Sequence, residues 1–283
     1  MVAVKHKETG EVLLEYEGDS LAGADLREYD LQGADLRGMD IRNAQFQGSD
    51  LSDADLEGAT LQNSVFIGTK LANTNLKGAD LDAARFSDGT SARAAVLAGA
   101  CLQDARATSC DFRFADLSGA DLSKATLSRS DFHYARMAGA NLRDAVIGSA
   151  LLIDADLHGA DLTGAYLCNV HMNGANLVDA RLDGAKLGGE DCIPAIMNLA
   201  NMTNASLVGA NLSGASLLNV NLTGADLSKA DLTNAVLSNS LLRKAKLNDT
   251  DFSGVDLATV TMTFATVSKA KNVYMPYPKS NLR

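Results

Sequence analysis

The sequence predicts an all-β fold, a four-sided parallel β-solenoid. An apolar residue recurs at every fifth position, and a small residue lies two positions before most of them. Neither the 3.6-residue period of a helix nor the two-residue period of a strand produces this spacing. The first series of apolar residues is Leu21, Leu26, Leu31, Leu36, Ile41, Phe46, Leu51, Leu56, Leu61, Phe66, Leu71, Leu76, Leu81 and Phe86.

A square coil accommodates this spacing. Each five-residue unit makes one side, and four units complete a turn of twenty residues. The central Leu or Phe and the Ala two before it point inward, as Ala24 and Leu26 illustrate. Stacked coils then pair their backbones as parallel ladders about 4.8 Å apart. The Gly, Ser, Asn and Asp residues that follow the apolar position suit the corners.

The repeating pattern A-(D/N)-L-x-x, seen in Ala24-Asp25-Leu26 and Ala34-Asp35-Leu36, resembles the pentapeptide repeat family. The resemblance spans roughly residues 20–270. It implies a right-handed quadrilateral β-helix. It implies no single function, because members of that family serve many roles.

The spacing of phenylalanines predicts an insertion. A second apolar series, from Leu97 to Val267, is out of phase with the first by one residue. Removing six residues between the two series aligns all the phenylalanines on one side of the coil. We therefore predict a loop of about six residues near 87–92, budding from a corner. The aligned residues would be Phe46, Phe66, Phe86, Phe112 and Phe132.

Three regions follow from this register. Residues 1–18 are expected to form a β-hairpin cap, with strands at Val2–His6 and Glu11–Tyr16. Residues 19–270 form the solenoid, of about 12 coils. Residues 271–283, with Pro276 and Pro278, are expected to form a C-terminal capping tail. The alternative for this C-terminal end is a homodimer contact.

Charge and composition argue against a nucleic-acid-binding protein and against a membrane protein. The net charge is −10, and residues 1–90 hold 17 acidic and 8 basic residues against 18 and 17 in residues 91–283. Such acidity disfavours direct nucleic-acid binding. No apolar run approaches the roughly 18 residues of a membrane span, and no signal peptide is visible. We expect a cytoplasmic protein that does not associate with membranes.

The titratable residues suggest no chemistry. The cysteines form no CxxC pair, so we expect reduced, structural thiols and neither a zinc site nor a disulfide framework. No Ser or Cys has a His and an acid at neighbouring stack positions. We therefore expect no enzymatic activity, no metal site and no cofactor. The cysteines are Cys101, Cys110, Cys168 and Cys192.

The predicted loop and its surroundings are the first candidate site. The corners equivalent to Asp88 on the next two coils carry Phe114 and Tyr134, and outward aromatics beside a loop are typical of an interaction patch. The alternatives are a tolerated insertion and aromatics that pack the base of the loop. The candidate partner-binding residues are Asp88, Gly89, Thr90, Ser91, Phe114 and Tyr134.

A distorted side is the second candidate. In phase, Glu190 would point into the coil, where an unpaired carboxylate is very costly. We expect the backbone to bulge there, with Asp191 beside Glu190, Pro194 at a corner and no net insertion before Met197. The bulge is either a binding notch or decay of the repeat.

The leading hypothesis is a non-catalytic scaffold that binds a protein partner of unknown identity. The resemblance implies two alternatives. Some relatives mimic DNA and modulate or protect DNA gyrase or topoisomerase IV, and the acidic first third fits that reading better than the near-neutral remainder does. Others are bacterial effectors or developmental regulators.

Overall fold

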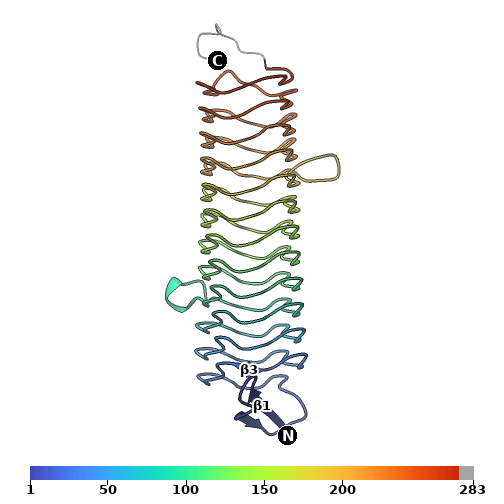
Figure 1. Cartoon of the computed structure of the whole chain (residues 1–283), viewed down its shortest axis with the longest axis vertical. Coiled ribbons are helices and arrows are strands. Elements are labelled where there is room, and N and C mark those ends of the chain that lie inside the picture. The colour runs from blue at the N-terminus through green and yellow to red at the C-terminus, as the bar shows by residue number, and fades with distance from the viewer. Residues whose placement is uncertain (274–283) are drawn as a thin grey trace. The chain divides into compact units, whose positions relative to one another are not determined.

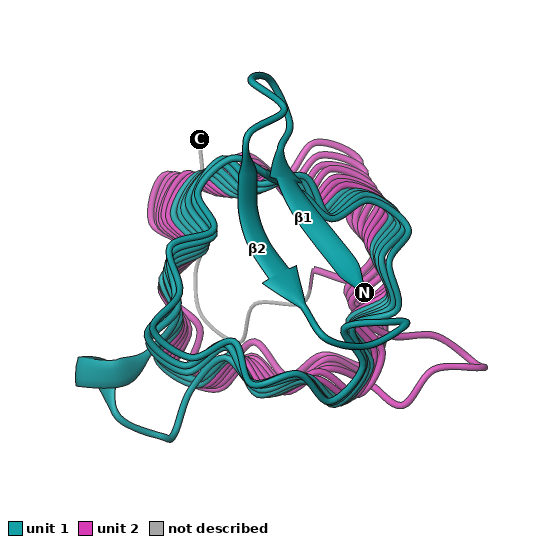
Figure 2. Ribbon diagram, turned by 90° about the horizontal axis from the view of Figure 1, so that it is seen from below, with its two compact units in different colours: residues 1–141 teal, residues 142–283 magenta. Residues whose placement is uncertain are grey.

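The computed structural model describes residues 1–273, which form stacked square coils in two compact units (Figures 1 and 2). Unit 1 is Met1–Asn141, and unit 2 is Leu142–Arg283, described as far as Val273. Each side is so short that its pairing with the next coil is a single parallel bridge, such as Asp25 with Gln45. The predicted parallel β-solenoid is therefore confirmed.

The core lies along the axis of each unit. The central apolar residues and the alanines two before them are fully buried, as for Ala24 and Leu26. On one side of unit 1 five phenylalanine rings stack face to face, with centroids 4.5–5.0 Å apart. This spacing is that of neighbouring β-strands, so the backbone ladder sets the ring separation. The stacked rings are Phe46, Phe66, Phe86, Phe112 and Phe132.

Hydroxyl groups replace alanine at some inward positions. The Thr69 hydroxyl, fully buried, donates a 2.6 Å hydrogen bond to the Phe46 carbonyl of the previous coil. Ser64 and Thr74 donate in the same way to Ile41 and Leu51. Each inward hydroxyl thus satisfies its own bonding need and adds a tie between coils.

The corners explain the polar half of the repeat. The second residue after the apolar position has a left-handed backbone, as at Gly33 (φ 66°) and Asn63 (φ 59°), which favours Gly, Asn and Asp. The carboxylate before the apolar position accepts the N–H two residues on, as Asp116 does from Ser118 at 3.0 Å. This is the Asx-turn, so the repeated Asp or Asn has a structural task.

The N-terminal residues form a hairpin in unit 1. Strand β1 (Val2–His6) pairs antiparallel with β2 (Val12–Tyr16) and with the short β3 (Ala34–Asp35). Figure 2 shows the hairpin crossing the end of the coil. Its capping role stays a prediction. The predicted C-terminal tail lies almost entirely outside the described residues.

Two segments leave the coils at corners. Bridged residues are normally twenty apart, but Arg85 pairs with Asp111 and His171 pairs with Ile196. Six residues are therefore inserted in unit 1 and five in unit 2. The expectation of no net insertion before Met197 was wrong, because an insertion of five residues preserves the five-residue phase and is invisible in the pattern. The five residues of the second insertion equal one side of a coil, so the solenoid is one side shorter than predicted.

Thr69→Val tests the inward hydroxyl bonds. Val keeps the shape but removes one donor from the buried Phe46 carbonyl, so we expect a loss of about 1 kcal/mol in the free energy of unfolding. Chemical denaturation measures it. The matched control is Thr60→Val, at an outward ladder position. Equal stability of the two variants would contradict a stabilising role for the bond.

Candidate functional site

The candidate site is built around the loop of residues 87–94. A regular corner is closed by a bond such as that from the Ala24 amide to the Leu21 carbonyl, 3.0 Å. At the loop the same bond runs from the Ala95 amide to the Phe86 carbonyl, 2.7 Å. The insertion therefore lies inside a turn and leaves the ladder in phase. The loop contains one turn of 3₁₀ helix, η1 (Ser91–Arg93).

Asp88 organises the loop. Its carboxylate accepts bonds from the Thr90 amide (3.0 Å) and the Thr90 hydroxyl (2.6 Å), and Arg93 lies 3.7 Å away. The Thr90 hydroxyl bond is the main reason that the pKa of Asp88 lies below its usual value, with the Arg93 charge adding to it. The loop is thus a turn whose backbone and side chains bind the Asp88 carboxylate.

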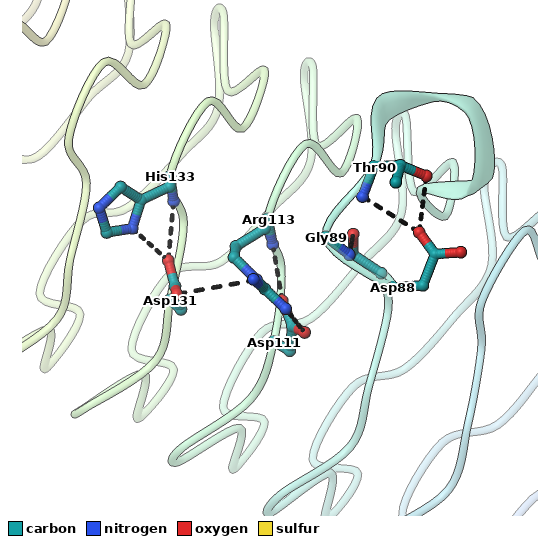
Figure 3. A network of polar contacts seen from close by, with 8 residues as sticks. Asp88, Gly89, Thr90, Asp111, Arg113, Asp131 and His133 are labelled. Atoms are coloured by element: carbon teal, nitrogen blue, oxygen red, sulfur yellow. Dashed lines mark hydrogen bonds and ion pairs between the residues drawn. The ribbon is translucent and has the colours of Figure 1, made fainter.

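Arg113 lies between the loop and the Asp131–His133 pair (Figure 3). Its guanidinium makes a bidentate bond with Asp111, at 2.8 and 2.7 Å, and reaches Asp131 at 3.8 Å. Asp131 in turn bonds the His133 ring at 2.5 Å. The bond with Asp111 is the chief cause of the raised pKa of Arg113. A Cβ added to Gly89 would lie 3.1 Å from this guanidinium, so the loop packs against it.

Beside Arg113 lies an aromatic pair. The rings of Phe114 and Tyr134 stack at 5.1 Å with an interplanar angle of 14°. Both residues occupy left-handed corners, with φ of 62° and 58°. The Tyr134 side chain is exposed. Large side chains are rare in this conformation, and each costs about 1 kcal/mol or more.

Arg93, at the end of η1, lines a shallow hollow of about 550 Å³ on the preceding coils. Within it, Arg27 forms two bonds to Asp25, and these hold the pKa of Asp25 at about 2. Tyr29, about two-fifths exposed, also lines the hollow. The loop therefore lies between this hollow and Arg113.

The structure brings five of the six candidate residues into two groups. Asp88, Gly89 and Thr90 belong to the polar network, and Ser91 is exposed in η1. Phe114 and Tyr134 form the aromatic pair, adjacent in sequence to Arg113 and His133. Sequence analysis missed the two arginines, Arg93 and Arg113. The position of Arg113 one residue after the aligned Phe112 was the available signal.

The distorted side in unit 2 is a second loop, residues 188–194. It is closed by the Ala195 amide and the Leu187 carbonyl at 2.8 Å. Glu190 and Asp191 are exposed at its tip, as the predicted escape of Glu190 from the core requires. Pro194 belongs to this inserted segment, which leaves the coil at a corner.

The loop at 188–194 also carries a disulfide. Cys192 is bonded to Cys168 of the preceding coil, with Cα atoms 5.3 Å apart. The expectation that all the cysteines are reduced was therefore wrong, because the insertion carries Cys192 back to a residue 24 positions earlier. Cys101 and Cys110 are free thiols. Burial raises the pKa of Cys110, whose Sγ lies 2.9 Å from the Leu81 carbonyl.

Within residues 1–273 no group of three or more His, Cys, Asp or Glu side chains is placed to hold a metal ion. The hydrogen bonds of these residues also give the His133–Asp131 pair no serine, threonine or cysteine partner. No helix in this part of the chain is long and apolar enough to span a membrane.

Thr90→Val tests the order of the loop. The pKa of Asp88 should rise toward 3.8, its ordinary value, because the Thr90 hydroxyl bond is lost. Because the folded loop lowers the pKa of Asp88, the ionised carboxylate stabilises the loop at every pH above 3.8. This stabilisation is lost as the pH falls from 3.8 through the lowered pKa. Carboxyl-carbon NMR titration measures the shift. Ser91→Ala is the control, and an unchanged Asp88 midpoint in Thr90→Val would refute the arrangement.

Several solved structures are similar to this chain. HetL, a pentapeptide repeat protein involved in heterocyst differentiation regulation in the cyanobacterium Nostoc sp. strain PCC 7120, is 28% identical over 86% of this chain and 91% of its own, with a TM-score of 0.36. The plasmid-mediated fluoroquinolone resistance protein QnrB1 is 24% identical over 72% and 84%, with a TM-score of 0.41. Superpositions this poor carry no functional conclusion.

A pentapeptide repeat protein from the Arabidopsis thaliana thylakoid lumen is 33% identical, but over only 42% of this chain and 66% of its own, with a TM-score of 0.27. No curated protein sequence matches the chain. The sequence profile described as pentapeptide repeats matches it in 8 copies, at residues that include 20–58, 49–88, 110–147, 150–189, 200–239, 221–257 and 235–271. These copies cover most of the chain, which therefore belongs to the pentapeptide repeat family.

Proposed function

We propose that this protein is a non-catalytic scaffold that binds a protein partner through the corner patch, defined as the 87–94 loop with Arg113, Phe114 and Tyr134. The observation that carries the proposal is the stacked aromatic pair beside the loop. The corner backbone favours Gly, Asn or Asp at those two positions, yet they hold large aromatic side chains. Leu199 and Phe264 accept the same conformation, so the feature that distinguishes this pair is the stacking of its two rings beside the loop.

The chemistry of the corner patch suits a protein surface. Aromatic and arginine side chains are enriched among the residues that contribute most to protein binding. Tyr134 is half exposed, while Arg113 is fixed by two carboxylates and so is already ordered before a partner arrives. The loop adds an edge that projects from the flat sides (Figure 1). We infer that Tyr134 and Arg113 form a preordered binding anchor and that the polar loop forms its rim.

A photo-crosslinking amino acid at Tyr134 tests this proposal in an extract of the source organism. We expect a discrete crosslinked protein that is lost when Asp88–Ala92 is deleted. Phe264 is the matched control position, since it too is an exposed aromatic at a left-handed corner (φ 63°).

Tyr134→Asn should then weaken binding of that protein by about tenfold or more, because an interface anchor is lost. Its thermal stability should be preserved, since Asn tolerates the corner conformation. The same adducts from positions 134 and 264, or none at 134, would refute the corner patch.

A second candidate is modulation of a type II topoisomerase through mimicry of DNA. The observation that favours it is charge, because unit 1 holds 22 acidic and 14 basic residues. Several of these carboxylates are already neutralised, as Asp25 is by Arg27 and Asp116 by Arg136. This pairing makes the first proposal the stronger one. The second candidate would also require the protein to reach a cellular topoisomerase.

A DNA gyrase supercoiling assay separates the two candidates. For the scaffold we expect no change in supercoiling at micromolar protein. Inhibition, or relief of a gyrase poison, would make the topoisomerase candidate the leading one. Loss of that effect on deletion of Asp88–Ala92 would place the contact at the corner patch.

The cytoplasmic location stays a prediction, and the Cys168–Cys192 bond weighs against it. Disulfides persist mainly in oxidising compartments. A homodimer contact at the C-terminal end also stays a prediction, because residues 274–283 lie outside the described part of the chain.

A further inference from the structure

The disulfide loop, residues 188–194, is fastened to the coils at three places. At its ends, Gly188 lies so close to the Ser213 backbone of the following coil that a Cβ there would collide with it, and Pro194 packs over Gly214. Its middle is joined to the preceding coil by the Cys168–Cys192 bond. Because the ends and the middle are drawn to opposite neighbours, the loop is held open.

Apart from the disulfide, little holds the middle. The Ile193 carbonyl accepts a 2.6 Å bond from the Asn169 amide, and the Cys192 amide closes a turn to the Gly189 carbonyl at 3.1 Å. Glu190 and Asp191 at the tip are exposed. The loop at 87–94 is different, since the Asp88–Arg93 ion pair and side-chain hydrogen bonds order it without a covalent link.

The loop position also shapes a hollow of about 460 Å³ in unit 2. Glu190 and Pro194 form its loop side, and Asn211, Ser213 and Asp231 of the following coils form part of the other. The disulfide draws the middle of the loop toward the preceding coil, away from these residues. Loss of the bond would leave the 2.6 Å hydrogen bond from the Asn169 amide to the Ile193 carbonyl to hold the loop to that coil.

We propose that Cys168 and Cys192 form a thiol–disulfide switch that sets the mobility of the disulfide loop and the opening of the hollow beside it. The reductant is a dithiol. One of its thiolates attacks a sulfur of the bond, and its second thiol resolves the mixed disulfide. Two electrons and two protons pass to the protein, which leaves thiols on Cys168 and Cys192 and a disulfide on the reductant.

The switch is local because the solenoid does not depend on it. The coils on either side are paired by the Leu187–Asn211 and Met172–Ile196 backbone bonds, which involve neither cysteine. Both cysteines are more than nine-tenths buried, so attack requires the loop to open. Asp191 and Ile193, on either side of Cys192, are exposed, so opening of the loop alone suffices.

The full-length protein tests the proposal in two steps. First, alkylation after denaturation without reductant should label two thiols, Cys101 and Cys110, and dithiothreitol treatment before denaturation should raise the count to four. Second, hydrogen exchange of residues 188–194 should accelerate about tenfold or more on reduction, because a locally ordered segment is released. Reoxidation should restore both values.

Two comparisons make the result specific. The Cys168→Ser/Cys192→Ser variant should exchange at 188–194 like the reduced protein without any reductant, and Cys101→Ser should behave as wild type. Exchange in the 87–94 loop and in the ladder should not change. Four thiols in the untreated protein, loop exchange indifferent to reduction, or loss of ladder protection on reduction would each overturn the proposal.

Discussion

The backbone ladder between coils is the constraint on which the rest of this structure depends. Each side offers its amide and carbonyl groups to the coil above and the coil below, so neighbouring sides must remain in register at the spacing of β-strands. The five-residue code follows from it, since each side has room for one large apolar side chain and one small one inside the tube. The phenylalanine stack, with centroids 4.5–5.0 Å apart, is the same constraint expressed in side chains.

Most of the fold was predictable because it repeats. A single pattern gives the inward and outward positions, and the step of 26 residues from Phe86 to Phe112 places the first insertion. The second insertion was hidden, since five residues equal one repeat and leave the phase unchanged. The disulfide was hidden for the same reason: Cys168 and Cys192 come together only once those residues leave the ladder.

The position of the candidate site was predictable from the sequence, but the pairing of its charged side chains was less so. Phe114 and Tyr134 follow from the register, because equivalent corners stack. The pairing of Arg113 with Asp111 and of Arg93 with Asp88 depends on the side-chain conformations and on the path of the loop, which periodicity does not specify. Fewer aspartates of the repeat are free to bind a partner than their number suggests. Many of them accept a hydrogen bond from the backbone amide two residues further on.

Both insertions enter at the same point of the repeat, between an apolar residue and the alanine that begins the next side. The closing bonds, Ala95 to Phe86 and Ala195 to Leu187, are the ordinary corner bond with a longer chain inside it. An extra peptide segment can thus be inserted at a corner without any change to the stacked coils. A protein of this kind can acquire or exchange binding segments one corner at a time, and a designer could graft peptides at chosen corners and know in advance where on the frame each would emerge.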